Sequence, residues 1–271
     1  MPASARSAGF LDLAERIGRR TVAGVAEIGF AAMLLVESLV WAITGHARRQ
    51  PVRLAAIVEQ MMEIGVMAIP IVSVLSITIG VMLAIQGIYT LRAFGAEEKV
   101  TLGVALSVTR EFAPLITGIL VAGRSGSALA ARIGTMSINQ EVDALTVMGI
   151  NPVRFLVAPP LFAMMVMLPA LTIYADLVAL FGAGLYIGAD LGMSMSTYFD
   201  RVVEALSIND VMHGIGKSVI FAALVALIGV VNGASVSGGA EGVGRVTTRA
   251  VVQGISAIVI TDMIFAFAIT R

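Results

Sequence analysis

Residues 137–152 read SINQEVDALTVMGINP, and this short polar stretch separates two long apolar segments. Ser137 and Gln140 have the spacing of a capping box, which favours the start of a helix. Gly149 suits the left-handed conformation that ends many helices, and Pro152 prevents the helix from continuing. A helix of this length is too short to cross a membrane, so we expect it to lie outside the bilayer as a docking element.

The predicted helix spans residues 138–148 and has two unlike faces. With about 100° between successive residues, the apolar face carries Ile138, Val142, Leu145 and Met148. The opposite face carries Gln140 and Asp143, with Glu141 at the border. We expect the apolar face to rest on the protein and the polar face to meet a partner.

The composition predicts an all-α polytopic membrane protein. Hydrophobic residues make up 58% of the chain and charged residues 13%, and the formal net charge is zero. Zero net charge argues against a nucleic-acid-binding protein, and the absence of cysteine excludes disulfides and thiolate metal sites. The only imidazoles, His46 and His213, are far apart in the sequence, so no metal site is expected.

Six apolar segments are long enough to cross a hydrocarbon core of about 30 Å. They are 22–44, 64–91, 102–131, 155–189, 212–233 and 250–270. A first segment that crossed would separate two arginine clusters, Arg16, Arg19 and Arg20 on one side and Arg48, Arg49 and Arg53 on the other. The positive-inside bias disfavours this, and the segment also contains Glu27 and Glu37. We therefore predict an interfacial elbow helix over 22–44.

Five membrane spans remain, within one membrane domain over residues 1–271. Loop charges then place the N-terminus in the cytoplasm, the C-terminus outside and the helix at 138–148 in the cytoplasm. The first 20 residues contain several arginines and lack the uninterrupted apolar core of a signal peptide. We therefore expect that the N-terminus is not cleaved off. Five spans enclose little space, which favours a symmetric dimer. Gly184/Gly188 and Gly229/Gly233 have spacings that permit close helix packing.

Several stretches from residue 60 onward resemble one known family, the MlaE/YrbE-type permeases of ABC transporters. They are EIGVMAIPIVSVLSITIGVMLAIQG at 63–87, REFAPLITGILVAGRSGSALAARIGTM at 110–136, NQEVDALTVMGINPVRFLVAPPLFA at 139–163, GKSVIFA at 216–222 and GGAEGVGRVTTRAVV at 238–252. The resemblance implies an N-terminal interfacial helix, five transmembrane helices, a homodimer and a cytoplasmic coupling helix that engages an ATPase.

The resemblance also implies partners and residue roles. The implied partners are ABC ATPase subunits that bind ATP and Mg, a periplasmic MCE-domain protein and a STAS-domain protein. We expect the coupling contact to involve Gln140, Glu141, Asp143, Leu145 and Met148. Two departures from the family pattern are Gln140-Glu141 in place of Glu-Gln, and Pro159-Pro160 in place of Pro-Arg. They leave open which side chain makes the polar contact with the ATPase.

No motif in the chain predicts catalysis or nucleotide binding. Gly216-Lys217-Ser218 resembles the end of a phosphate-binding loop, but Val211 occupies the place of its first glycine. The glycines of 238–244 follow no strand, so a tight turn between the last two spans is favoured over a dinucleotide site. Ser125 and Ser127 have no histidine nearby in the sequence. We expect a transport subunit with no cofactor of its own, and ATP hydrolysis by another chain.

Charged residues within the apolar segments are costly, because each costs at least ~2.5 kcal/mol in lipid. They are Glu111, Arg124, Asp176 and Asp262. Pairing between helices, protonation of the carboxylates or snorkelling of Arg124 is favoured over direct substrate contact. Pairing of Arg124 or Lys217 with a carboxylate would hold the bundle together. The alternative is that Lys217, near the outer face, meets a phospholipid headgroup.

A lipid path is predicted at the end of the first true span, LAIQGIYTL at 83–91. Helical spacing near the outer leaflet brings together Leu83, Gln86, Tyr89 and Thr90. They offer an apolar wall for acyl chains and polar groups for a headgroup, although helix packing explains them equally well.

We expect a permease of the bacterial inner membrane that moves phospholipid to or from an MCE-domain carrier and maintains outer-membrane lipid asymmetry. Alternatives are import of another hydrophobic molecule, such as a sterol or solvent, and a structural anchor of a lipid tunnel. A third is an ion-coupled carrier that uses Asp176 and Asp262.

Overall fold

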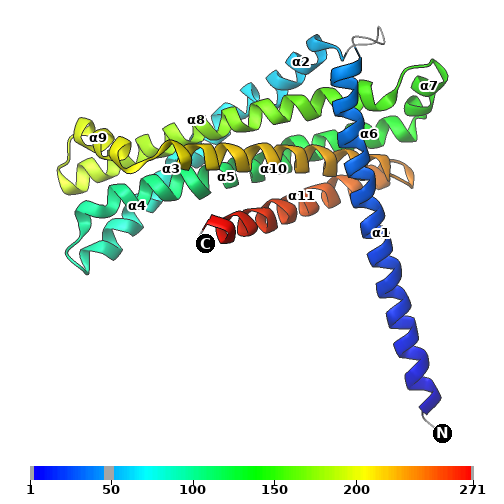
Figure 1. Cartoon of the computed structure of the whole chain (residues 1–271), viewed down its shortest axis with the longest axis horizontal. Coiled ribbons are helices and arrows are strands. Elements are labelled where there is room, and N and C mark those ends of the chain that lie inside the picture. The colour runs from blue at the N-terminus through cyan, green and yellow to red at the C-terminus, as the bar shows by residue number, and fades with distance from the viewer. Residues whose placement is uncertain (1–2, 46–51, 270–271) are drawn as a thin grey trace.

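The computed structural model describes residues 3–45 and 52–269, and these residues form helices joined by short turns, with no strand (Figure 1). The α-helices are α1 Ala3–Thr44, α2 Leu54–Ile64, α3 Ile69–Arg92, α4 Val100–Ser107, α5 Ala113–Val121, α6 Ser127–Ile138, α7 Glu141–Val147, α8 Ala158–Leu191, α9 Met195–Ala205, α10 Ile208–Ala234 and α11 Gly239–Ile269. Short 3-10 turns precede α3 and α4 at Val66–Ala68 and Glu97–Lys99. The predicted all-α polytopic fold is confirmed.

Two π-helical turns join neighbouring helices without a break, and a third begins the long helix that continues as α8. They are Val108–Phe112 between α4 and α5, Ala122–Gly126 between α5 and α6, and Val153–Val157 before α8. Each turn inserts wider backbone geometry into a helix without ending it, a feature often found at functional sites. The segment from Glu97 to Ile138 is therefore one long apolar helical rod.

The helices α8 and α10 form the core of a bundle. In the most apolar window of each, 61% of the residues of α8 and 56% of those of α10 are buried, against 17% for α11. The largest fully buried side chains include Leu168 of α8 and Phe221 of α10. The outer helices α3 and α11 therefore leave broad apolar faces that suit lipid or a second subunit.

Small residues set the closest contacts between helices. A Cβ on Gly229 of α10 would lie 2.9 Å from the backbone oxygen of Gly126, and one on Gly233 would lie 2.8 Å from that of Ala130. The predicted close packing at Gly229/Gly233 is confirmed, and it joins α10 to α6 within one chain. Gly184 and Gly188 face Tyr198 and the turn at Met193 instead of another long helix.

In the described part of the chain, six helical segments are long and apolar enough to cross a membrane. They are Gly24–Thr44, Leu54–Arg92, Glu97–Ile138, Val153–Leu191, Ile208–Ala234 and Gly239–Ala268. The six predicted apolar segments are thus found. The observed helices extend beyond them because polar end turns continue the helical backbone.

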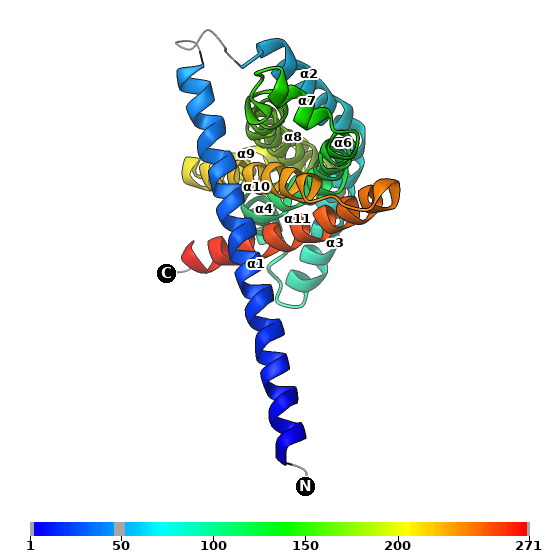
Figure 2. The ribbon, with the colours of Figure 1, turned by 90° about the vertical axis from the view of Figure 1, so that its right-hand side faces the viewer.

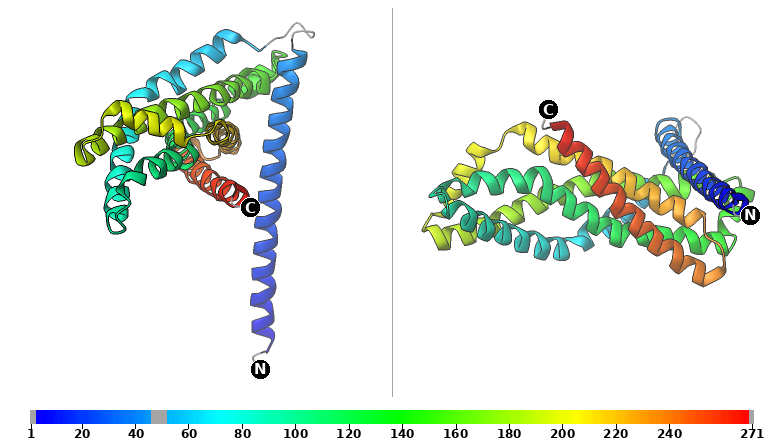
Figure 3. Two further views of the ribbon diagram at one scale, coloured as in Figure 1. Left: turned by 60° about the vertical axis from the view of Figure 1, so that its left-hand side comes forward. Right: turned by 90° about the horizontal axis from the view of Figure 1, so that it is seen from below.

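The first of these segments differs from the others in direction. Figure 1 shows α1 running across the long axis of the bundle, and Figure 2, which looks along that axis, shows it passing in front of the other helices. Its N-terminal half extends beyond the other helices (Figure 3). An interfacial helix would have this direction if the other five segments cross the bilayer. The interfacial role itself remains a prediction.

The predicted helix at 138–148 is only partly correct. It comprises α7 alone, because Ile138 is the last residue of α6 and Gln140, with a φ of 59°, makes a left-handed turn between the two helices. The predicted capping box is wrong, since Ser137 lies within α6 and Gln140 makes no side-chain cap. The predicted end is confirmed. Gly149 has a φ of 73°, and the backbone N–H of Ile150 donates to the oxygen of Leu145 at 2.9 Å.

Candidate functional site

The exposed face of α7 combines acidic and apolar side chains at one end of the bundle. Glu141 and Asp143 are exposed in its first turn, and Val147 and Met148 are 89% and 64% exposed. Leu145 is buried and anchors the helix against the bundle. The predicted apolar face is thus partly wrong, because Met148 and Ile138 are exposed. Gln140, Glu141, Asp143 and Met148 remain available to a partner, whereas Leu145 does not.

The loop after α7 is tied to α1. The Asn151 side-chain nitrogen Nδ2 donates to Oε1 of Glu37 at 2.8 Å, and the Asn151 oxygen Oδ1 accepts from the backbone N–H of Arg154 at 3.0 Å. The guanidinium carbon of Arg154 lies 5.8 Å from the centre of the Trp41 ring. A second link joins Arg249 of α11 to Glu27 of α1 at 2.5 Å. The loop after α7 and the helix α11 are thus both joined to α1 by side-chain contacts.

At the other end of the bundle, a cavity of about 290 Å³ opens between α3 and α4. Its lining includes Leu83, Gln86 and Thr90 of the predicted lipid path, together with Gly87, Leu91, Val100, Gly103, Val104 and Ser107. Tyr89 does not line the cavity and is 78% exposed. The structure therefore brings together three of the four predicted residues, Leu83, Gln86 and Thr90. A mostly apolar wall with a few polar groups is typical of a site for an amphiphile.

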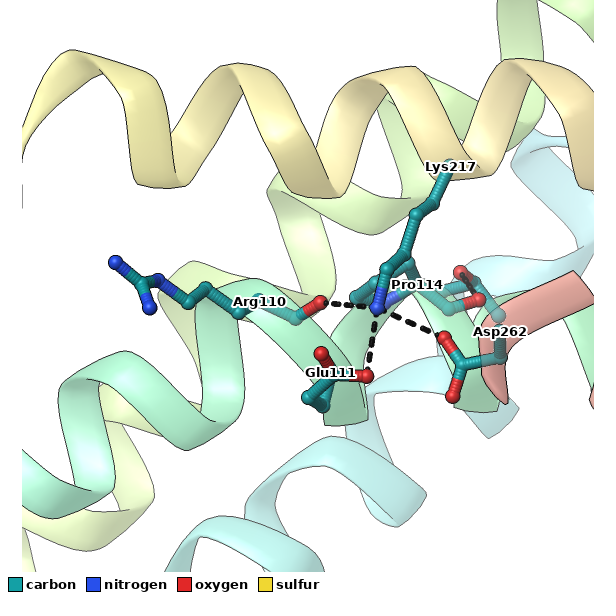
Figure 4. Close-up of polar contacts among 6 residues, drawn as sticks. Arg110, Glu111, Pro114, Lys217 and Asp262 are labelled. Atoms are coloured by element: carbon teal, nitrogen blue, oxygen red, sulfur yellow. Dashed lines mark hydrogen bonds and ion pairs between the residues drawn. The ribbon is translucent and has the colours of Figure 1, made fainter. Parts of the chain in front are cut away.

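A buried ionic cluster lies one helical turn beyond this cavity. Lys217 of α10 is fully buried, and its ammonium nitrogen donates to Oε2 of Glu111 at 2.6 Å and to Oδ1 of Asp262 at 2.9 Å (Figure 4). A third bond, at 3.0 Å, goes to the backbone oxygen of Arg110. The π-helical turn Val108–Phe112, α10 and α11 thus meet at one ammonium group. The predicted pairing of Lys217 with a carboxylate is confirmed.

Glu111 is the most exposed member of the cluster and follows a cavity-lining residue in the chain. Its side chain is 36% exposed, whereas that of Lys217 is 0% exposed. Ser107, which lines the cavity, precedes Glu111 by four residues, so about one helical turn separates them. Among the three side chains of the cluster, Glu111 is therefore the most accessible.

Sequence reasoning missed a second ion pair beside this cluster. Arg110 Nε donates to Oδ1 of Asp210 at 2.6 Å, and Asp210 also accepts from the backbone N–H and hydroxyl of Ser207 at 2.8 Å. Ser207 and Asp210 form a true capping box at the start of α10. The signal was present in the Ser-x-x-Asp spacing before an apolar run.

Two further predicted intramembrane charges have no ion pair within residues 3–45 and 52–269. The side chain of Arg124 is exposed in the π-helical turn Ala122–Gly126. The oxygen Oδ1 of Asp176, on α8, is buried with no hydrogen-bond partner. Neither residue joins the cluster of Lys217, so the predicted pairing is confirmed for Glu111 and Asp262 only.

The features that resembled nucleotide-binding motifs have structural roles. Lys217 is engaged by two carboxylates, and Gly238 and Gly239, with φ values of 87° and 69°, form the turn between α10 and α11. Among the described residues, no group of three or more His, Asp or Glu side chains could hold a metal ion. The ring of His213 stacks edge-on against Phe265, and His46 lies outside the described residues.

Comparison with known proteins assigns the chain to a family. A family model described as Permease MlaE matches residues 57–268. A probable ABC transporter permease protein of Rickettsia bellii is 32% identical over 260 residues, which cover 94% of this chain and 98% of the relative. The intermembrane phospholipid transport system permease protein MlaE of Haemophilus influenzae is 33% identical over 210 residues, covering 77% of this chain and 80% of the relative. The chloroplastic protein TRIGALACTOSYLDIACYLGLYCEROL 1 of Arabidopsis thaliana is 33% identical over 208 residues, which cover 77% of this chain and 59% of the relative. The family model covers most of the chain, and this chain therefore belongs to the MlaE permease family.

Proposed function

We propose that the chain is the membrane subunit of an ATP-driven transporter that moves phospholipid between the inner membrane and a periplasmic MCE-domain carrier. In a Gram-negative cell this activity would maintain the lipid asymmetry of the outer membrane. The observation that carries the proposal is the amphipathic cavity between α3 and α4 in a member of the MlaE permease family. The named function of the Haemophilus relative, intermembrane phospholipid transport, supports phospholipid over a sterol or solvent.

The transporter would be a homodimer with two ABC ATPase subunits, which bind ATP and Mg. The N-terminus and α7 would lie in the cytoplasm, and the C-terminus and the cavity on the periplasmic side. A STAS-domain protein would bind on the cytoplasmic side. The broad exposed apolar faces of α3 and α11 support dimer formation, because a pair of subunits would enclose the cavity.

The cavity would hold the ends of acyl chains against Leu83 and the headgroup near Gln86 and Thr90. Its volume of about 290 Å³ is at the lower limit for ligand pockets, so one chain supplies only part of the lipid site. A second subunit would supply the remainder.

Photo-crosslinking within the assembled transporter tests this proposal. A photoreactive amino acid at residue 83 or 90 should form an adduct with phospholipid, and ATP should reduce the yield as the lipid moves to the MCE-domain protein. Residue 85 is the matched control, because Ile85 lies on the same helix, is exposed and does not line the cavity. Equal, ATP-independent yields at all three positions would contradict the proposal.

A further inference from the structure

A second cavity lies at the opposite end of the bundle, close to α7. It has a volume of about 360 Å³ and lies between the start of α2, the end of α6 and the start of α8. Its lining residues are Arg53, Ala55, Ala56, Glu59, Gln60, Arg132, Ile133, Met136, Arg154, Phe155, Leu156, Pro159 and Pro160. Three arginines and one glutamate thus share the wall with apolar side chains, and the cavity carries an excess of positive charge.

The arginine charges of this cavity are not neutralised within the described residues. Arg132 Nη2 donates at 2.7 Å to Oε1 of Gln60, which is a neutral acceptor. Arg154 Nε is buried and has no hydrogen-bond partner. Arg53 precedes α2 without capping it, and it has no ion pair with any residue that the structure describes. A buried guanidinium N–H without an acceptor is costly, so the geometry favours an anionic ligand.

We propose that this cavity binds the phosphate of an anionic phospholipid from the cytoplasmic leaflet. Arginine side chains bind phosphate oxygens through paired, charge-assisted hydrogen bonds. Basic pockets between membrane helices on the cytoplasmic side bind anionic headgroups. The apolar lining, including Phe155, Leu156 and the buried Pro159 and Pro160, would contact the glycerol and the first acyl carbons.

This site is separate from the proposed transport cavity. It lies at the end of the bundle that holds α7, whereas Leu83 and Thr90 lie near the far end of α3. The inference rests on the proposed function only in placing the α7 end in the cytoplasm. Bound lipid would stabilise the junction of α1, α7 and α8, because Arg154 lies between the cavity and Trp41.

The chain contains its own reporter of this site. Trp41 is the only tryptophan, and it lies 5.8 Å from the guanidinium carbon of Arg154. The purified full-length chain in nonionic detergent would be titrated with short-chain phosphatidylglycerol while Trp41 fluorescence is followed. Diacylglycerol, which lacks phosphate, and inorganic phosphate, which lacks chains, would be titrated in parallel. We expect a saturable change with phosphatidylglycerol, no response to diacylglycerol and much weaker binding of inorganic phosphate.

The variant Arg132→Gln should raise the half-saturating lipid concentration by about tenfold or more, because a charge-assisted hydrogen bond is lost. Arg53→Gln should also raise the half-saturating lipid concentration. Because the side chain of Arg53 is exposed, this substitution should leave the fold intact. Arg245→Gln is the matched control, because Arg245 pairs with the exposed Glu241 and lies outside the cavity. Circular dichroism and gel filtration would confirm that each variant is folded.

Three results would overturn the inference. The first is a titration that is unchanged by both Arg132→Gln and Arg53→Gln. The second is inorganic phosphate matching phosphatidylglycerol, which would make this a site for free phosphate. The third is unchanged lipid binding with weaker binding of the ATPase subunit, which would make the arginines a protein contact. Because the titration requires neither ATP nor transport, failure of the proposed function would leave its result unaffected.

Discussion

The ammonium nitrogen of Lys217 lies 2.6 Å from Oε2 of Glu111, and this pair joins α10 to the π-helical turn before α5. Asp262 of α11 shares the same ammonium group at 2.9 Å. The fully buried lysine and its two carboxylates thus link three helical segments by charge. Breaking such a cluster by removing one member costs more than replacing all of it with neutral groups.

Lys217→Met should therefore destabilise the protein by about 3–5 kcal/mol, because two carboxylates lose their counter-ion. The triple variant Lys217→Met, Glu111→Gln, Asp262→Asn should recover much of this loss. The measurement is thermal unfolding of the detergent-solubilised chain. A triple variant no more stable than Lys217→Met alone would show that the charges are not what holds these helices.

The hydrogen bond from Asn151 to Glu37 predicts a route from α7 to α1. Asn151→Asp would place two carboxylates together, and we expect more ATP to be hydrolysed for each lipid moved. Asn209→Asp is the matched control, because Asn209 is exposed at the other end of the bundle. The ratio of ATP hydrolysed to lipid transferred in proteoliposomes measures the effect. An equal ratio in the two variants would exclude this route.

Hydrophobic length predicted the long helices because it is a local property of the chain. The apolar segment at 212–233, for example, lies wholly within α10. The predicted capping box was wrong because α6 continues to Ile138, beyond the predicted apolar segment that ends at residue 131. In this added part of α6, Gly134 packs against Val236 and Val246. The competing turn at Gln140 uses a left-handed conformation that a non-glycine residue adopts infrequently, so its sequence gave no signal.

In the candidate sites, too, the sequence predicted local features and missed those that depend on helix packing. Helical spacing placed Leu83, Gln86 and Thr90 on one wall, but it could not show that Tyr89 points elsewhere. The pairs of Lys217 with Glu111 and of Arg110 with Asp210 join residues about a hundred positions apart. Such contacts depend on how the helices associate, so no local pattern predicts them.

The acidic face of α7 gives a direct test of coupling. Glu141→Lys with Asp143→Lys should reduce ATP-driven lipid transport by more than about tenfold, because losing a charged interface contact costs about 2–5 kcal/mol. The chain should remain folded, since both side chains are exposed. Leu145→Ala should behave differently and lower thermal stability, because Leu145 is buried. Transport and ATP hydrolysis that are unchanged by the double reversal would contradict docking at α7.

Asp176 separates an ATP-driven permease from an ion-coupled carrier. Its Oδ1 is buried without a hydrogen-bond partner, so replacing the carboxylate with the neutral amide of Asn should leave stability unchanged or raise it by about 1–3 kcal/mol. Under the proposed function, Asp176→Asn should keep ATP-driven lipid transfer in proteoliposomes, with or without a proton gradient. Asp262→Asn should instead lower stability, because Asp262 is a partner of Lys217. Loss of transport in folded Asp176→Asn, together with transport by the wild-type chain that needs a gradient and no ATP, would favour the ion-coupled carrier.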